Sequence, residues 1–353
     1  MRGKQTGDGR MSAYREAVQL LLRGGDLGTA LASAVMCEML DGACTPAQIG
    51  SLLMGLARRV ETIDEFVGFA EAMRERAVPI TITGDPIDTC GTGGSGLATM
   101  NTSTAAAFVL AAGGVSVAKH GNRASSGVCG AMDVLEHLGV AIELGPTAAA
   151  ALLAEHGIAF LFTPRYHPAL RTVAPIRREL GFRTIFNFLG PLCNPARVTR
   201  QVLGVSDPHR APRMAAALSR LGSRHVLVAS GDHGLDELSL TGTTHIWEVR
   251  DGGVREMCIR PEDVGLAPAA PEEIAGGDRH CNGELLLEVL SGRHRGAHAR
   301  HVALNAGAGF FVAGKTASLA DGVSLATDIL TSGTAHDIFE RYRVATQQLL
   351  ETV

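Results

Sequence analysis

The stretch Ile87-Asp88-Thr89-Cys90-Gly91-Thr92-Gly93-Gly94-Ser95-Gly96 joins a short apolar segment to a glycine-rich turn. We expect a strand at 87–89, a helix of small residues at 105–112 and a second strand at 115–118. A strand, a helix and a strand in this order predict two parallel strands of one sheet. Glycines also let consecutive backbone N–H groups approach a phosphate closely, so the turn is a candidate anion site.

Downstream of this unit the same alternation continues. We expect further strands at 158–162, 202–205 and 225–229, and helices at 134–138, 148–155 and 214–221. The pattern predicts an α/β domain over 81–353 with a mainly parallel sheet flanked by helices. Ligands of such sheets usually bind at the carboxyl ends of the strands, so the loops that follow the strands are the candidate sites.

Upstream of residue 80 the pattern is helical. Apolar residues recur at helical spacing over 13–22 and 27–40, and Thr45-Pro46-Ala47-Gln48 and Thr62-Ile63-Asp64-Glu65 are helix-start signals. Four short helices without a strand predict a small helical subdomain over 11–80, which packs on the rest of the chain or on another subunit. Residues 1–10 are polar and predict a flexible tail.

The composition is that of a globular enzyme of the reducing cytoplasm. The 353 residues are 46% hydrophobic and carry a net charge of −4, so the overall charge does not indicate nucleic acid or an anionic membrane as a partner. The seven cysteines are scattered and form no Cys-x-x-Cys pair, which fits a cytoplasmic location. No apolar run reaches the roughly 20 residues that span a bilayer.

The glycine-rich turn matches the Gly-x-Gly-x-x-Gly pattern of dinucleotide-binding proteins only formally. That function requires an acidic residue about 20 residues further on, at the end of the second strand. Here Lys119-His120 stands at that end, and no Gly-Lys-Ser/Thr follows to make a P-loop. For this motif alone, a flexible turn without a ligand is an equal alternative.

Three further segments carry polar side chains where strands end or helices begin. Asn101-Thr102-Ser103-Thr104 is either a helix cap or a second phosphate site. The segment 119–127 gathers Lys, Arg and hydroxyl groups, with a solvated basic loop as the alternative. The segment 231–237 ends in adjacent acids that suit Mg²⁺, although a solvated acidic turn is the better interpretation of that motif alone.

Two mixed clusters complete the candidate sites. Tyr166-His167-Pro168, Arg177 and the segment 187–191 suit an aromatic substrate that carries a carboxylate, although a lone His or Arg is more often structural. A second cluster contains several imidazoles but only one nearby cysteine, and we expect no zinc site there. Its members are His280, Cys281, His294, His298 and His301.

In combination, these segments resemble the anthranilate phosphoribosyltransferase family of tryptophan biosynthesis. The resemblance covers nearly the whole chain after the tail, and the ordered set of motifs is specific although no single motif is. The matching segments are Gly91-Thr92-Gly93-Gly94, Asn101-Thr102-Ser103-Thr104, Lys119-His120-Gly121-Asn122-Arg123, Asp133-Val134-Leu135-Glu136, His167-Pro168-Ala169, Arg183-Thr184-Ile185-Phe186-Asn187, Gly190-Pro191-Leu192, Asn194-Pro195-Ala196, Gly234-Leu235-Asp236-Glu237 and Leu304-Asn305-Ala306-Gly307.

The resemblance implies a nucleoside-phosphorylase-like fold, a homodimer through the helical subdomain, and a returning segment at 177–195 that joins this subdomain. It implies transfer of the phosphoribosyl group of phosphoribosyl pyrophosphate to anthranilate, with two Mg²⁺ ions and with Lys119, Asp236 and Glu237 as catalytic residues. Phosphoribosyl pyrophosphate would bind at Gly91, Gly94, Ser95, Thr99, Asn101, Ser103, Thr104, Lys119 and Ser126. Magnesium would bind at Ser103, Asp236 and Glu237, and anthranilate at Gly91, His120, Asn122, Tyr166, His167, Arg177 and Pro191.

The sequence departs from the family at several of these positions. Ser95 stands where the family often has Asp, and Met100 where Phe is usual. Gly127, Cys129 and Ala131 replace hydroxyl residues of the basic loop, which predicts weaker phosphate binding rather than a different reaction. The sequence leaves open whether the acceptor is anthranilate or a substituted analogue.

No residue of these motifs is an evident nucleophile, so we expect direct displacement of pyrophosphate by the neutral aromatic amine. Lys119 and magnesium would neutralise the charge that builds up on the leaving group. Two alternatives remain: a pyrimidine nucleoside phosphorylase, which shares the fold, and a non-catalytic relative that binds nucleic acid. The adjacent acids and Asn122 favour the pyrophosphate enzyme over the first, and the net negative charge disfavours the second.

Overall fold

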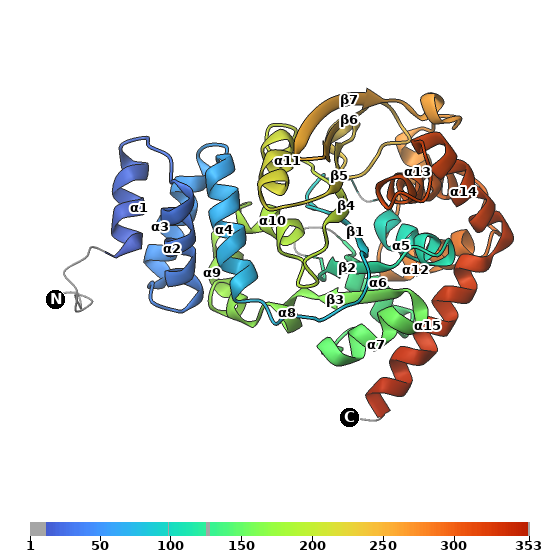
Figure 1. The fold of residues 1–353 in the computed structure, drawn as a ribbon, viewed down its shortest axis with the longest axis horizontal. Helices are drawn as coiled ribbons and strands as arrows, with labels where there is room; N and C mark the ends of the chain where they lie inside the picture. Colours follow the sequence, from blue (N-terminus) through green and yellow to red (C-terminus); the bar gives the residue numbers. More distant parts are fainter. Residues whose placement is uncertain (1–11, 98, 125–127, 352–353) are drawn as a thin grey trace.

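The computed structural model describes residues 12–97, 99–124 and 128–351, and its two parts lie along the longest axis of the molecule (Figure 1). At one end, α1 (Ala13–Leu22), α2 (Thr29–Leu40), α3 (Pro46–Ala57) and α4 (Ile63–Glu75) pack together. The capping boxes expected at the starts of α3 and α4 are confirmed, because both reciprocal hydrogen bonds form at each. Among the described residues no helix is long and apolar enough to cross a membrane.

The other end is built on one seven-stranded sheet with the order β3-β2-β1-β4-β5-β6-β7. The strands from β3 to β5 in this order are parallel, whereas β6 and β7 add in antiparallel fashion. A mainly parallel sheet is therefore confirmed. The strands are β1 (Ile87–Gly91), β2 (Val117–Gly121), β3 (Ile158–Phe162), β4 (Arg200–Gly204), β5 (His225–Ser230), β6 (Thr244–Arg250) and β7 (Gly253–Ile259).

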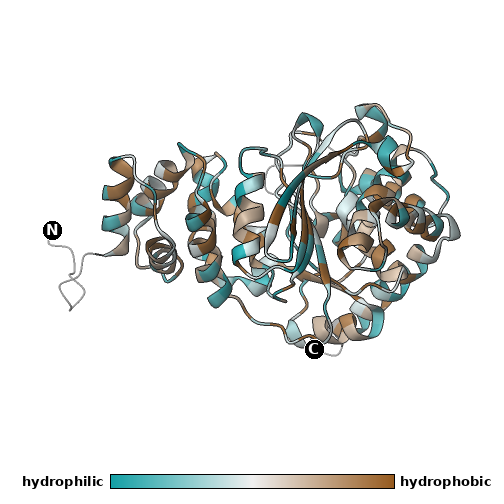
Figure 2. Cartoon of the chain, turned by 45° about the horizontal axis from the view of Figure 1, so that its top comes forward, coloured by the Kyte–Doolittle hydropathy of each residue, from teal (hydrophilic) through white to brown (hydrophobic). Residues whose placement is uncertain are grey.

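Helices cover both faces of this sheet (Figure 2). Apolar side chains of the strands and the helices are buried together in shared clusters. One face packs on α11 and the helical subdomain, and the other on α5, α13 and α15. The helices of this part are α5 (Thr102–Ala112), α6 (Ala131–His137), α7 (Pro146–His156), α8 (Thr163–Tyr166), α9 (Ala174–Leu180), α10 (Phe186–Leu189), α11 (Ala211–Arg220), α12 (Arg279–Leu290), α13 (Ala297–Val312), α14 (Leu319–Ser332) and α15 (Thr334–Glu351).

The segment between β3 and β4 returns to the helical end. Val173, Phe186 and Leu192 are buried in the same apolar cluster as α2, α3 and α4. Asn194 then ties the segment to the sheet, because its amide donates to Asp88 Oδ2 and to the carbonyl of Ala118, both at 2.8 Å. The returning segment expected at 177–195 thus contacts both parts of the molecule.

One boundary differs in a way that affects the site. The second strand was expected to end at residue 118, but β2 continues to Gly121 and contains Lys119 and His120. Both side chains are buried, because β2 lies between β1 and β3. Burying the charged amine of a lysine costs desolvation free energy. A buried lysine in a strand therefore requires anionic or carbonyl partners.

Candidate active site

The order of the strands places a crevice beside β1. From β1 the chain moves outward through β2 to β3 on one side and from β4 to β5 on the other, so the sheet changes direction between β1 and β4. The carboxyl ends of strands at such a switch point form a ligand site. A cavity of about 410 Å³ lies there, lined by the loops after β1, β2 and β5 and by the start of α5.

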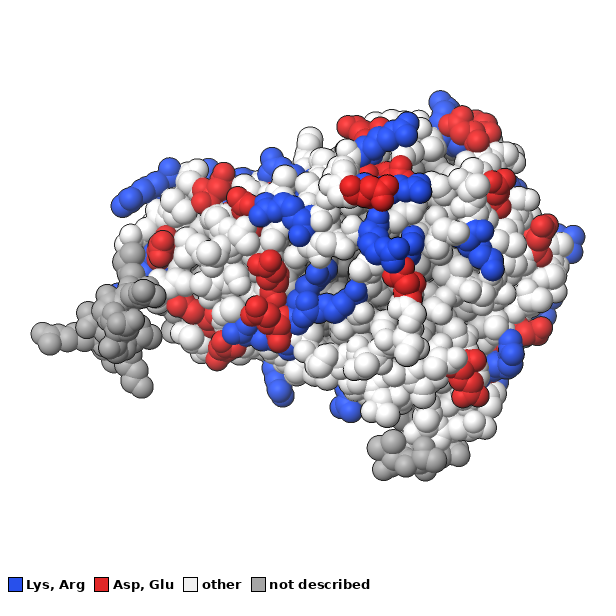
Figure 3. Space-filling view, viewed as in Figure 1, with Lys and Arg blue, Asp and Glu red and all other residues white. Residues whose placement is uncertain are grey.

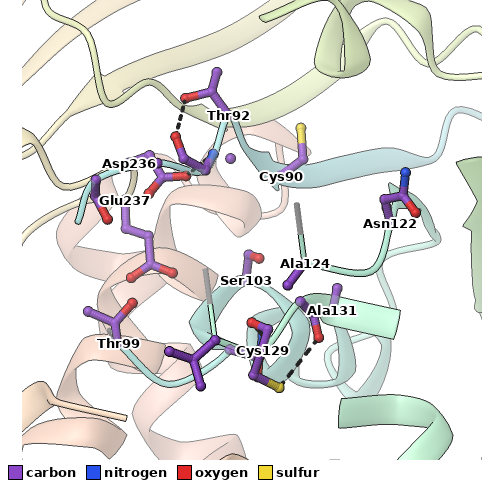
Figure 4. A pocket seen from close by; sticks show the side chains of 18 of the residues that line it. Cys90, Thr92, Thr99, Ser103, Asn122, Ala124, Cys129, Ala131, Asp236 and Glu237 are labelled. Atoms are coloured by element: carbon purple, nitrogen blue, oxygen red, sulfur yellow. Dashed lines mark hydrogen bonds between the residues drawn. The ribbon is translucent and has the colours of Figure 1, made fainter. Parts of the chain in front are cut away.

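Most of the predicted site residues line this cavity. In the close-up, Asp236 and Glu237 enter from one side, Asn122 and Ala124 from the other, and Ser103 lies between them (Figure 4). The predicted residues in its wall are Gly91, Gly94, Ser95, Thr99, Asn101, Ser103, Lys119, His120, Asn122, Asp236 and Glu237. Thr104 is buried in α5 behind this wall, and Ser126 lies outside the described residues.

The glycine-rich loop after β1 is held from two sides. Gly93 donates its N–H to Asp236 Oδ2 at 2.7 Å, so one backbone donor of the loop already binds an anionic group. On the other side Arg183 and Ser206 bind loop carbonyls. The Ser95 hydroxyl bonds within the loop, to Leu97 N and O at 3.3 Å each. The loop is therefore an ordered set of backbone donors, as the sequence predicts for an anion site.

Lys119 crosses from β2 toward the start of α5. Its Nζ donates to the carbonyl of Thr89 and, at 3.1 Å, to Ser103 Oγ. Burial lowers the pKa of this amine, and the carboxylates of Asp88, Glu237 and Asp236 act in the opposite direction. A cation at this depth, with acids around it, is suited to a phosphate oxygen or a leaving pyrophosphate.

The two acids of the loop after β5 are placed where negative charge is costly. Burial raises the pKa of Asp236, and burial together with the charge of Asp236 raises the pKa of Glu237 well above its usual value. Among the described residues Glu237 Oε2 has no hydrogen-bond partner. Two buried carboxylates facing a phosphate cradle fit a divalent cation, since Mg²⁺ is usually held by one or two carboxylates plus phosphates and water. No group of three or more His, Cys, Asp or Glu side chains within the described ranges is arranged for a metal.

Helix α13 fixes the backbone that carries these acids. Asn305 accepts from Leu238 N at 3.0 Å and donates to Leu238 O at 3.1 Å, and His301 Nε2 lies 3.0 Å from the same carbonyl. His301 Nε2 is also 3.5 Å from Glu237 Oε2. Burial lowers the pKa of His301 to about 4. His301 therefore supports the acid loop, whereas His294 and His298 contact each other elsewhere on the surface, with ring centroids 5.2 Å apart.

The start of α5 and the loop after β2 are joined by two asparagines. Asn101 stands at the N-cap of α5 but makes no capping hydrogen bond with its side chain. Its amide instead donates to Cys129 O at 3.2 Å, and its Oδ1 accepts from Asn282 of α12 at 3.0 Å. The side chain of Asn101 therefore does not cap the helix, which was one of the two interpretations of this segment. The amide is used to hold the loop after β2, which leaves the helix start open to the cavity.

The residues predicted for the acceptor are divided between the cavity and the layer behind it. His120 and Asn122 line the cavity, and His167 packs behind His120 with ring centroids 5.1 Å apart. Both imidazoles bind backbone carbonyls, and burial lowers their pKa to about 3 for His120 and about 4 for His167. These rings are neutral at physiological pH, so they shape the wall without adding charge.

Three predicted acceptor residues lie away from the cavity. Tyr166 is fully buried among apolar side chains, with its hydroxyl 3.4 Å from Leu144 O, so the structure gives it a packing role instead. Pro191 is buried in the returning segment, where its carbonyl accepts from Gln201. Arg177 lies on α9 with its guanidinium 5.2 Å from the centre of the Phe186 ring.

Sequence reasoning missed several residues that hold the site in place. Arg183 and Asn305 lie inside segments that matched the family, so the resemblance offered a signal but no role. Asp88, buried in β1, accepts from His120 N at 3.2 Å, and burial raises its pKa to about 6. Asn282 had no sequence signal, because it is a single polar residue on a helix and its partner at the site, Asn101, is 181 residues away.

Comparison with known proteins agrees with this geometry. Residues 83–336 match the family model described as the a/b domain of a glycosyl transferase family, and residues 15–77 match its helical bundle domain. Anthranilate phosphoribosyltransferase of Chloroflexus aggregans is 48% identical over 328 residues, which cover 93% of this chain and 96% of that protein.

Solved structures of the same enzyme show the same fold. The structure from Thermus thermophilus has a TM-score of 0.90 and 45% identity, and the match covers 96% of this chain and all of that one. The enzyme of Saccharomyces cerevisiae, solved in complex with PRPP and Mg, has a TM-score of 0.86 and 25% identity, covering 96% and 99% of the two chains.

Proposed function

The chain belongs to the anthranilate phosphoribosyltransferase family, and from this premise we propose that it transfers the phosphoribosyl group of phosphoribosyl pyrophosphate to the amine of anthranilate. The products are N-(5-phosphoribosyl)anthranilate and pyrophosphate. The observation that carries the proposal is the meeting of backbone donors, Lys119 and two buried acids in one cavity at the switch point of the sheet. Such a set is suited to an anion that binds together with a divalent cation.

Asp236, Glu237 and Ser103 are the residues that would hold magnesium, and two ions are expected. Magnesium bound there would neutralise charge on the pyrophosphate as it leaves. The raised pKa values of the two acids support the assignment, because burial outweighs the nearby Lys119 cation and a bound divalent cation would offset that cost. Ser103 supports it as well, since its hydroxyl faces the cavity and is already oriented by Lys119.

The chain's own groups bind and orient the donor. The backbone N–H groups of the glycine-rich loop and the ammonium of Lys119 bind phosphate oxygens of the sugar pyrophosphate. The aryl amine of anthranilate is weakly basic and neutral at physiological pH, so it needs no base before it attacks. The reaction therefore depends on stabilising the departing anion and on aligning the amine, which are electrostatic and positioning effects.

On the acceptor side, His120 and Asn122 form the wall that faces an aromatic ring. Arg177 is proposed to bind the carboxylate of the acceptor. Arg177 is half-buried, burial lowers the pKa of its guanidinium, and within the described part of the chain this group makes no hydrogen bond or ion pair. A partly desolvated guanidinium without an anionic partner is unfavourable, so an incoming carboxylate would be bound favourably.

The direct test is an acceptor screen with phosphoribosyl pyrophosphate and Mg²⁺, which follows the loss of anthranilate fluorescence. Substituted anthranilates tested beside anthranilate identify the preferred acceptor by kcat/KM. A parallel reaction with a pyrimidine nucleoside and phosphate tests the phosphorylase alternative. Product from the nucleoside, together with none from phosphoribosyl pyrophosphate, would contradict the proposed function.

Two further features belong to this proposal. A homodimer through the helical subdomain is supported by apolar side chains left exposed there, namely Leu22 of α1 and Met54 of α3. Light scattering on the purified protein tests it. A cytoplasmic location is supported by the seven cysteines, all of which are free thiols.

The nucleic-acid alternative finds no support in the surface charge. On the face shown in Figure 3, Lys and Arg side chains are interspersed with Asp and Glu side chains rather than gathered into one basic patch. A titration with single-stranded DNA at moderate salt, followed by fluorescence anisotropy, checks this point.

A further inference from the structure

Three consecutive carbonyl groups of the glycine-rich loop are bound on one side by two side chains. Arg183 donates from Nη2 to Thr92 O at 3.3 Å and from Nη1 to Gly94 O at 3.1 Å. Ser206 Oγ donates to Gly93 O at 2.8 Å, between these two contacts. Arg183 Nη1 also lies 2.8 Å from Ser206 Oγ, so the guanidinium and the hydroxyl form one connected clamp.

This clamp determines where the backbone donors of the loop point. In a trans peptide unit the carbonyl and the following N–H point in opposite directions. Binding the carbonyls of Thr92, Gly93 and Gly94 therefore turns the N–H groups of residues 93, 94 and 95 to the opposite side. The N–H of Gly93 already donates to an anionic group, Asp236 Oδ2. Those of Gly94 and Ser95 have no partner among the described residues, and both residues line the cavity.

We propose that Arg183 is a positioning residue that orients the peptide units of the glycine-rich loop so that their N–H groups form the pyrophosphate cradle. The inference rests on the proposed function and adds a role for a residue that does not line the cavity. Arg183 is itself held by the ring of Phe188, whose centre lies 4.8 Å from the guanidinium carbon. Because Phe188 belongs to the returning segment, the clamp also joins the helical part of the molecule to the donor site.

The requirement for glycine at residue 94 follows from the same contact. A Cβ built there would lie 2.1 Å from Arg183 Nη1, and the backbone has a φ of +77°. A side chain at residue 94 would therefore displace the flexible end of Arg183 from the loop, and it would also strain a backbone with positive φ. An alanine at 94 should be less harmful when the guanidinium is absent, whereas the strain from the positive φ remains in both backgrounds.

The experiment compares Arg183→Met, which keeps an apolar stem against Phe188, with Arg178→Met as the matched control. Arg178 lies on the same segment, is exposed and does not contact the loop.

For each variant, KM is measured for both substrates, and the Kd of phosphoribosyl pyrophosphate with Mg²⁺ is measured by calorimetry without acceptor. Arg183→Met is expected to raise KM and Kd for the donor by about tenfold or more, the factor that corresponds to one lost charge-assisted hydrogen bond. The acceptor KM should change by less than about twofold. A general loss of folding would instead raise both KM values, so the comparison separates the two causes.

Two further variants keep the proposal testable if Arg183→Met is unstable. Ser206→Ala removes the contact to Gly93 O together with the hydroxyl that contacts Arg183, but keeps both contacts of the guanidinium to the loop, and should raise the donor Kd in the same direction by a smaller factor. Gly94→Ala should raise the donor Kd less in the Arg183→Met background than in the wild type. The effects of the two substitutions on the donor Kd are therefore not additive in a double-mutant cycle. The proposal is wrong if the donor Kd is unchanged in Arg183→Met and Ser206→Ala, or if the two KM values rise by the same factor.

Failure of this inference is distinguishable from failure of the proposed function. If the wild-type protein gives no product from phosphoribosyl pyrophosphate and anthranilate, the proposed function fails. Calorimetry with magnesium pyrophosphate alone still tests the cradle in that case, because the clamp concerns the binding of an anion and not the transfer step.

Discussion

At the scale of single residues, the glycines around the cavity are required by this chain's own close contacts as much as by a ligand. A Cβ at Gly91 would lie 2.3 Å from Asp236 Oδ2, and one at Gly204 would lie 1.6 Å from Asp236 O. Both positions must stay free of a side chain so that the acid loop can pass across the ends of β1 and β4. The glycines after these strands are therefore required where the acid loop passes close to the strand ends, as well as for the proposed phosphate site.

The first prediction concerns the paired acids. Asp236→Asn together with Glu237→Gln is expected to lower kcat by at least about a thousandfold, because the stabilisation of the leaving group is lost. The same variant should be at least as stable as the wild type, since it removes two carboxylates whose pKa values are raised by burial. The measurements are initial rates over a series of Mg²⁺ concentrations and thermal unfolding. Glu256→Gln on the exposed side of β7 is the control, and near-normal activity of the double variant at limiting Mg²⁺ would contradict the assignment.

The second prediction concerns the acceptor carboxylate. Arg177→Ala should raise the acceptor KM by the equivalent of about 2–3 kcal/mol, as expected for one charge-assisted bidentate contact. The KM of phosphoribosyl pyrophosphate should change little. Arg178→Ala removes an exposed charge from the same helix and serves as the matched control. An equal rise in both constants for Arg177→Ala means that Arg177 is structural or acts on the donor.

What the sequence reveals at this scale depends on how local the signal is. Two adjacent acids after a strand made Asp236 and Glu237 candidates for Mg²⁺, but for this motif alone a solvated acidic turn was favoured, and the family resemblance gave them the metal role. Tyr166 was assigned to the acceptor from its mixed aromatic and polar segment and from the family resemblance, yet adjacent residues point in different directions and Tyr166 is fully buried. The direction of a side chain in an irregular segment depends on tertiary packing that no short motif encodes.

At the scale of elements, one strong local signal was overlooked. Asp251-Gly252 joins β6 to β7, and both residues have positive φ values, 51° and 78°. A two-residue Asp-Gly connection between alternating strands is the preferred sequence of a tight hairpin turn. The strands β6 and β7 were therefore predictable from sequence, whereas the helix–strand alternation used upstream gave no reason to expect them.

Helix α13 was not predictable in the same way. Gly307 and Gly309 lie inside it, and glycine lowers helix propensity by about 1 kcal/mol. The glycines are required by packing, because a Cβ at Gly307 would lie 2.6 Å from Val323 N of α14. The helix forms because it is buried along most of its length, so tertiary packing overrides its local preference.

The third prediction tests this helix as the support of the acid loop. Asn305→Ala leaves the buried N–H of Leu238 without its partner, at a cost of about 1–3 kcal/mol. The Mg²⁺ concentration for half-maximal rate should rise, because the loop that carries Asp236 and Glu237 is no longer held in position by Asn305. Val312→Ala at the far end of α13 is the control, since it destabilises the same helix without contacting the loop. If the two variants shift the Mg²⁺ midpoint equally, the effect of Asn305 is one of general stability.

At the scale of the whole molecule, the returning segment is the link between the helical part and the sheet. Its carbonyls at Gly190 and Cys193 bind the imidazoles of His120 and His167, with distances of 3.1 Å and 3.0 Å. The wall of the acceptor side is therefore made at the junction of the two parts.

The last prediction concerns the pH dependence of this junction. Burial lowers the pKa of His120 to about 3 and of His167 to about 4, whereas an unfolded histidine titrates near 6.5. The stabilisation from the neutral rings is therefore complete above about pH 6.5 and is lost as the pH falls, by roughly 2 kcal/mol for each ring at pH 5. Asp88 acts in the opposite direction, because burial raises its pKa to about 6 and protonation then favours the folded state. Because these effects oppose each other, the test compares the change in the free energy of unfolding with pH between variants. The pH dependence of the wild type alone does not separate them.

His167→Gln keeps an N–H donor for Cys193 O but cannot take up a proton in this range. The free energy of unfolding, measured with urea at pH 7 and pH 5, should therefore fall by about 2 kcal/mol less for this variant than for the wild type. His209→Gln changes an exposed histidine and should reproduce the wild-type difference. If His167→Gln and His209→Gln respond equally to acid, the junction is not held by a neutral His167, and the loss of stability at low pH must come from other groups.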